Sequence, residues 1–178
     1  SGSVDYRATN PVVGVAWRVS PTLNLYANAG RGFETPTFTE LAYRPVGTGL
    51  NTALKASRAR HAEVGAKWRP AAAHRIDLAV VDIQTRDEIV VDTNSGGRST
   101  FKNAGRTGRR GAELQYLGAL GAWRPTIALP ALRATFRDAF VSGSGAAAVP
   151  VAAGNSLPGT PERSAFAELA YAPARAWG

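Results

Sequence analysis

Apolar and polar residues alternate with a period of two along several stretches of this chain, each about ten residues long. Val13, Val15 and Trp17, for example, alternate with Gly14, Ala16 and Arg18. Because successive side chains of a β-strand point to opposite faces, this pattern predicts strands with one apolar and one polar face. The stretches are residues 12–19, 23–29, 61–69, 111–116 and 164–171.

Two further stretches predict strands less clearly. His74–Val91 is apolar on both faces, so the pattern does not show which face meets an apolar environment. Thr126–Phe140 alternates but contains Pro130, which cannot donate a hydrogen bond to a strand ladder. A helix is the alternative for the alanine-rich residues 71–80, although branched residues and the period of two favour a strand.

An aromatic residue closes an apolar stretch shortly before a proline at four places, spaced about fifty residues apart: Trp17, Trp68, Trp123 and Tyr171. Connections near Ser20, Pro70, Leu120 and Pro173 are short, whereas 31–57, 92–100 and 142–160 are long and polar. Transmembrane β-barrels combine short periplasmic turns, long extracellular loops and aromatic girdles. We therefore predict an all-β fold, an antiparallel up-and-down meander of about seven strands forming a partial transmembrane β-barrel.

In such a barrel the four aromatic residues would mark the periplasmic membrane interface. The outward-facing side chains would form one continuous, exposed apolar surface, larger than a soluble monomer carries. We expect that surface to include Val13, Trp17, Leu25, Val64, Trp68, Leu114 and Leu169.

The net charge of +8 and the isoelectric point near 10.6 raise the question of nucleic-acid binding. The densest basic run, Lys102–Gly111, has neither a recognition helix nor a stacking motif beside it, so we expect no nucleic-acid partner. At a bacterial surface, cationic residues have two other partners, the phosphates of lipopolysaccharide and an anionic ligand. No run of about eighteen apolar residues is present, so a transmembrane helix is not expected.

Catalysis has little support in the sequence. His61 and His74 are the only histidines, and neither has the spacing of a metal ligand or a nucleophile partner. Asp87 and Glu88 are adjacent and would point to opposite faces of a strand. Ser57 and His61 would lie about 13 Å apart on one strand face, too far for a hydrogen bond. We expect no enzyme, no cofactor and no bound metal.

Residues 25–41 read LYANAGRGFETPTFTEL and closely resemble a segment of the TonB-dependent outer-membrane receptors. Further stretches that resemble the family follow in its order, so that the resemblance covers about Asn10 to Pro173. It implies a receptor in the bacterial outer membrane that imports a chelated metal, with a ferric siderophore as the expected ligand and the TonB complex as partner. These stretches are residues 60–67, 86–91, 101–107, 110–114 and 157–161.

In that family a TonB-engaging box and a globular plug precede the barrel, and neither has a counterpart here. The family's closing strands are also missing, and barrels of this type have about 22 strands around a plugged lumen. We therefore expect residues 1–178 to be one segment of the barrel domain, roughly its third quarter. The ligand itself stays open among siderophores, haem, cobalamin, copper chelates and sugars, although no loop cluster of histidine or methionine favours haem or copper.

The resemblance also suggests two sets of site residues. Polar strand residues would line the lumen, where they solvate the pore or contact the plug: Asn24, Tyr26, Asn28, Glu63, Lys67, Glu113, Gln115, Arg133 and Arg137. Aromatic and cationic residues near the outer mouth suit catecholate or hydroxamate chelates of iron, with loop packing or lipopolysaccharide contact as the alternative. These are Arg31, Phe33, Tyr43, Arg44, Arg98 and Arg109.

A second class of protein stays open, a β-rich surface binding module such as an adhesin or a carbohydrate-binding sandwich. In a sandwich Leu23, Leu25, Val64 and Leu114 would pack against a second sheet, whereas in a barrel they would face lipid or detergent.

Overall fold

The computed structural model describes residues 3–44, 47–143 and 148–173, and the long loops 31–57 and 142–160 each contain a few residues outside those ranges. The described part is almost entirely β-structure, with a single four-residue helix. No helix there is long and apolar enough to cross a membrane. The elements are β1 (Val12–Ser20), β2 (Leu23–Glu34), α1 (Phe38–Leu41), β3 (Ser57–Ala71), β4 (His74–Arg86), β5 (Ile89–Ser95), β6 (Arg98–Asn103), β7 (Arg106–Gly118), β8 (Trp123–Phe136), β9 (Phe140–Ser142), β10 (Val149–Val151) and β11 (Phe166–Tyr171).

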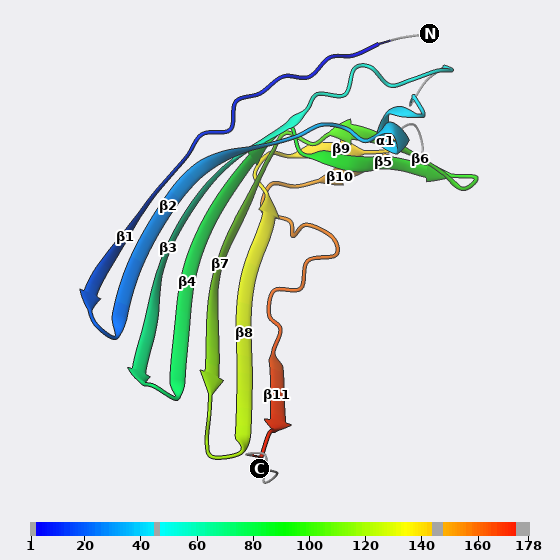
Figure 1. Ribbon diagram of the computed structural model, residues 1–178. Helices are drawn as coiled ribbons and strands as arrows, with labels where there is room; N and C mark the ends of the chain where they lie inside the picture. Colours follow the sequence, from blue (N-terminus) through cyan, green and yellow to red (C-terminus); the bar gives the residue numbers. More distant parts are fainter. Residues whose placement is uncertain (1–2, 45–46, 144–147, 174–178) are drawn as a thin grey trace.

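Seven strands form one open sheet in the order β1-β2-β3-β4-β7-β8-β11. Every neighbouring pair is antiparallel, and the long strands stand side by side in chain order (Figure 1). The predicted meander is confirmed. Residues 61–69 and 111–116 are strands as expected, and the helical alternative for 71–80 is wrong, because β4 begins at His74.

The hydrogen-bond register gives the sheet two faces of different chemistry. The apolar face carries Leu25, Ala66, Leu78, Leu114 and Leu129 opposite one another across five strands. The polar face carries the residues between them. The seven residues predicted to form a continuous apolar surface lie on the apolar face, with exposed fractions from 36% for Leu25 to 72% for Val13. Their shared face and their exposure agree with the prediction, while the total area of that surface remains a prediction.

The register also settles the orientation of β4. Ile76, Leu78 and Val80 lie on the apolar face, opposite Trp68, Ala66 and Val64. Val81 and Ile83 consequently lie on the polar face, which explains why this strand is apolar on both sides.

Pro130 is accommodated within β8 because the ladder with β11 ends before it. β11 pairs only with residues 123–128 of β8. The Pro130 carbonyl accepts a hydrogen bond from the Ser164 amide at 3.2 Å, on the β11 side. The nitrogen of a strand residue points to the same side as its carbonyl, so the missing N–H falls where no regular ladder requires it.

Two predicted strands were too long. His74–Val91 divides at Asp87, whose positive φ of 56° interrupts the extended backbone, and Ile89 begins a separate strand. Thr126–Phe140 likewise divides, because β8 ends at Phe136 and β9 begins at Phe140. The predicted loop 92–100 is therefore mostly a hairpin, in which β5 pairs with β6.

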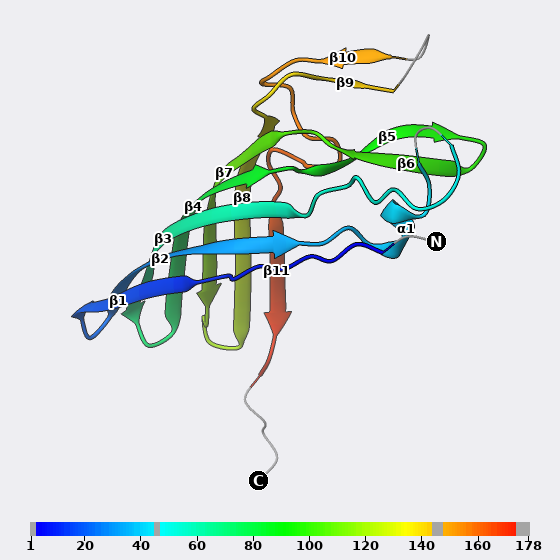
Figure 2. The same cartoon turned by 90° about the horizontal axis from the view of Figure 1, so that it is seen from above.

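Loops gather at one end of the long strands, where Figures 1 and 2 show α1 and the hairpins β5–β6 and β9–β10. A small core of Ala104, Ala134, Phe136 and Leu157 forms there, with Phe140 packed against it. The rings of Phe136 and Phe140 meet edge to face, 4.9 Å apart. Ala134 and Phe136 belong to the polar face of β8, so this core covers that face at the loop end.

Candidate functional site

The loop between β2 and β3 is held against the β5–β6 hairpin by amide side chains. Asn51 donates from Nδ2 to the Phe101 carbonyl at 3.1 Å. Asn103 accepts from the Lys55 amide and donates to the Lys55 carbonyl, each at 2.9 Å. Within the same loop, Thr37 and Glu40 form the capping box that begins α1, a local signature readable in the sequence TFTE. The loop is therefore ordered by its own cap and by its neighbour.

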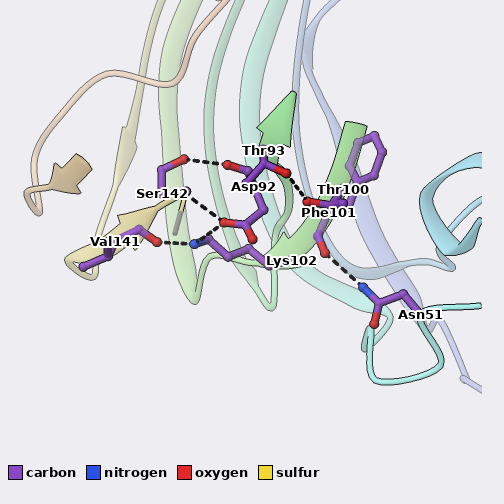
Figure 3. A network of polar contacts seen from close by, with 9 residues as sticks. Asn51, Asp92, Thr93, Thr100, Phe101, Lys102, Val141 and Ser142 are labelled. Carbon is purple, nitrogen blue, oxygen red and sulfur yellow. Dashed lines mark hydrogen bonds and ion pairs between the residues drawn. The ribbon is translucent and has the colours of Figure 1, made fainter. Parts of the chain in front are cut away.

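A second set of contacts joins the two hairpins (Figure 3). Lys102 of β6 and Asp92 of β5 form an ion pair at 2.6 Å, and the Asp92 side chain is 9% exposed. Asp92 also accepts a hydrogen bond from the Gly143 amide at 3.1 Å, while Lys102 donates to the Val141 carbonyl. One buried carboxylate thus connects β5, β6 and the end of β9. We call the described residues of the loop 35–56 and of the two hairpins the loop cluster.

Three of the six predicted mouth residues lie in the loop cluster. The Arg98 guanidinium stacks over the Tyr43 ring, 5.3 Å from its centroid, so the fold brings these two residues together from different loops. Tyr43 remains 41% exposed. Arg44 instead turns back to its own loop, where it donates to the Leu50 carbonyl and to the Thr52 hydroxyl.

Arg109 is occupied by neighbours on the polar face of the sheet. It forms an ion pair with Glu88 at 2.6 Å and donates to the hydroxyls of Thr85 and Thr107. Thr107 is 1% exposed. The side chains of Arg109, Glu88, Thr85 and Thr107 therefore satisfy one another's hydrogen bonds where β7 meets the start of the β5–β6 hairpin. These contacts tie the loop cluster to the sheet.

Arg31 and Phe33 occupy a different surface from the other mouth residues. Both lie on the apolar face, opposite Arg60 and Arg58, and not on the face of Asn28 and Glu63. Arg31 belongs to a set of arginines that we call the arginine patch. It consists of Arg31, Arg58, Arg60, Arg86, Arg106, Arg110, Arg133 and Arg137, all on the apolar face at its loop end.

The prediction that Arg133 and Arg137 share the face of the other lumen residues is wrong. Arg133 lies opposite Arg110 on the apolar face. Arg137 covers Gly108 on the same face. Its Nε lies so close that a Cβ on Gly108 would be only 2.5 Å away. Near the loops, the apolar face of β8 carries arginine and its polar face carries apolar residues. There the polar face is covered by the small core, so β8 turns Ala134 and Phe136 inward and its arginines outward.

The other seven predicted lumen residues do share the polar face. Asn24 lies opposite Lys67, and Asn28 lies opposite Glu63. Tyr26 lies across Gly65, where a Cβ would come within 2.4 Å of its ring, so only glycine leaves room for it. The Lys67 Nζ lies 5.3 Å from the Tyr26 ring centroid. Glu113 and Gln115 continue this face on β7. Their contact with a lumen or a plug remains a prediction.

The four aromatic residues Trp17, Trp68, Trp123 and Tyr171 all fall on the apolar face, toward the short turns. Trp123 and Tyr171 are paired across β8 and β11 with ring centroids 4.9 Å apart. Their position at a membrane interface remains a prediction.

Two carboxylates of this region, Asp138 and Asp82, are held in ion pairs. Arg106 binds Asp138 at 2.6 Å, and its hydrogen bonds lower the pKa of that carboxyl, so the pair stays ionised at neutral pH. Arg110 of β7 binds Asp82, which lies directly opposite it on the neighbouring strand β4. In the described part of the chain, no three histidine, cysteine or acidic side chains gather in a way that could hold a metal ion.

Comparison with solved structures shows the same fold in two proteins, an iron transporter and a ferric-catecholate import receptor. The FrpB iron transporter from Neisseria meningitidis (F3-3 variant) has a TM-score of 0.60 and 18% identity, over 91% of this chain and 24% of that protein. The ferric-catecholate import receptor Fiu from Escherichia coli K12, in its closed form, has a TM-score of 0.64 and 23% identity, over 90% of this chain and 22% of that protein. The chain thus spans about a quarter of either structure.

The model of the family described as TonB dependent receptor-like, beta-barrel, matches residues 1–178, the full sequence. The family consists of outer-membrane receptors and transporters, and the open meander with an exposed apolar face is the geometry of a barrel segment. This chain therefore belongs to the TonB-dependent receptor β-barrel family.

Proposed function

We propose that this chain forms part of the wall and outer mouth of a bacterial outer-membrane receptor that imports a ferric siderophore with energy from the TonB complex. The observation that carries the proposal is the combination of an exposed apolar face with an ordered loop cluster at one end. In a surface-binding sandwich, Leu25 and Leu114 would be covered by a second sheet. Within the described residues they are 36% and 39% exposed.

The pair Tyr43 and Arg98 is the best candidate for ligand contact in this segment. Its partners come from two loops, and the exposed Tyr43 presents an aromatic surface beside a cation. An anionic iron chelate with aromatic arms would gain from both groups. Arg44 and Arg109 are engaged by protein groups, and we assign them a structural role. The whole loop set of the receptor shares the ligand, so one substitution weakens binding without abolishing it.

We predict that Arg98→Ala or Tyr43→Ala in the complete receptor weakens ferric-siderophore binding by about 1–2 kcal/mol, the cost of one charge-assisted or cation–π contact. Binding of radiolabelled ferric siderophores to whole cells, with a panel of catecholate and hydroxamate chelates, measures the effect. Arg69→Ala, at the short-turn end of β3, is the matched control. If both loop variants bind every chelate that the parent binds with unchanged affinity, this ligand site is wrong.

A further inference from the structure

The arginine patch occupies consecutive rows of the sheet. Arg58 lies opposite Arg86, which lies opposite Arg106. The next row on this face places Arg31 opposite Arg60. One row further, Arg110 lies opposite Arg133. Rows on one face are separated by two residues, about 7 Å along a strand. Side chains from five strands, together with Arg137 just after β8, therefore converge on one area, and only the register brings them together.

Directly below the row of Arg110 and Arg133, apolar residues occupy the next rows of this face. Val64, Val80 and Ala112 lie opposite one another there, and Leu78 and Leu114 follow in the next row. Val64 and Val80 are 55% and 48% exposed. The patch thus borders the apolar surface on the same face of the same strands, as a headgroup layer borders acyl chains.

Most of the patch is not neutralised by the protein. Arg106 pairs with Asp138 and Arg110 with Asp82. In the ranges that the structure describes, the other six members form no ion pair with a carboxylate: Arg31, Arg58, Arg60, Arg86, Arg133 and Arg137. Like charges packed this closely repel one another, so a polyanion bound there would be strongly favoured.

The patch also has a hollow in which a headgroup can sit. A cavity of about 1030 Å³ lies between the segment that precedes β1 and the patch. Its lining includes Arg7 together with seven of the eight patch arginines, with Asp87 as the single acidic residue. Guanidinium groups bind phosphate through two parallel hydrogen bonds, a geometry that a multiply phosphorylated group can exploit repeatedly.

We propose that the arginine patch binds the phosphate groups of lipopolysaccharide, with the acyl chains lying along the apolar face below. This assignment rests on the proposed membrane location, and it separates Arg31 from siderophore binding. The polar face and the loop cluster remain the surfaces for the chelate, because the patch points to the opposite side of the sheet.

The test uses the complete receptor in detergent micelles and the double variant Arg60→Gln/Arg86→Gln, two patch members without a carboxylate partner. Binding is measured by native mass spectrometry or microscale thermophoresis with bisphosphorylated lipid A, with enzymatically dephosphorylated lipid A, and with inorganic phosphate. The matched control, Arg18→Gln/Arg69→Gln, removes the same charge near the short turns. Ferric-siderophore binding is measured on the same preparations.

We expect the affinity of the double variant for bisphosphorylated lipid A to fall about tenfold or more. Each hydrogen bond to a charged group raises the affinity by at least about tenfold. The dephosphorylated lipid should bind weakly to all forms, and the control should match the parent. Equal lipid affinity in the double variant and the parent would overturn the proposal, as would saturation of the patch by inorganic phosphate alone at equal affinity.

The two proposals fail in distinguishable ways. If the double variant loses siderophore binding and keeps lipid binding, the patch is a chelate site and this inference is wrong. If the parent binds no siderophore but binds lipid A through the patch, the lipid site stands and the proposed ligand is wrong.

Discussion

Phe136 shows at the scale of one residue how the loop end is stabilised. Its side chain is 5% exposed, and it contacts Phe140 across the boundary between β8 and β9. We predict that Phe136→Ala lowers the local free energy of unfolding of the loop cluster by about 3 kcal/mol, the low end for a buried phenylalanine. Amide hydrogen exchange in the complete receptor, followed at β5, β6 and β9, measures this loss.

Phe38→Ala is the matched control for that substitution. Phe38 is 77% exposed in α1, so removing its ring opens no cavity. Equal exchange rates in the two variants would show that the small core does not hold the loops.

At the scale of the elements, the two hairpins depend on one carboxylate. Asp92 binds Lys102 and the Gly143 amide together, so Asp92→Asn removes a charge and weakens both contacts. Because hydrogen bonds to charged groups contribute about 1.5–3 kcal/mol each, we expect β9–β10 to separate from β5–β6 more often. Limited proteolysis of intact cells should then cleave the β9–β10 loop several times faster, with barrel assembly unchanged.

The matched control for the hairpin contact is Asp5→Asn. Asp5 pairs with Arg7, but both side chains are highly exposed, at 73% and 90%, so the lost ion pair should have no measurable effect. If the two variants are cleaved equally fast, Asp92 does not connect the hairpins.

At the scale of the whole molecule, the apolar face determines where charge is tolerated. Leu114 lies in the middle of the apolar rows, between Leu78 and Leu129. We predict that Leu114→Arg costs about 2–4 kcal/mol, the penalty for arginine on the lipid face near the bilayer midplane. The complete receptor should then assemble poorly, which heat-modifiability on gels reports directly.

Gln115→Arg is the control that tests whether the face of the sheet on which the charge lies determines the effect. It adds the same side chain at the next position of β7 but on the polar face. Normal assembly is expected for this variant, and equal damage from both would contradict the assignment of the two faces.

Much of the strand layout could be predicted from the sequence, because alternation with a period of two is a local property of each strand. Val13 and Trp17 on one face, and Asn24 and Asn28 on the other, follow from parity within a single segment. The boundaries at Asp87 and Phe136 were not readable in that way. Apolar residues resume shortly after both positions, at Ile89 and Ala139, and only the backbone shows where the chain leaves the main sheet.

The sequence by itself determined the meander, the two-faced strands and the family, since alternation and motif order need no long-range information. The tertiary structure decided which face each arginine occupies. Arg133 and Arg31 are polar residues on the apolar face, above its apolar rows, and the small core buries the opposite face of β8 beside Arg133. It also decided that Tyr43 meets Arg98 and that arginines from separate strands form one patch, because hydrogen-bond register and loop packing join residues that are distant in sequence.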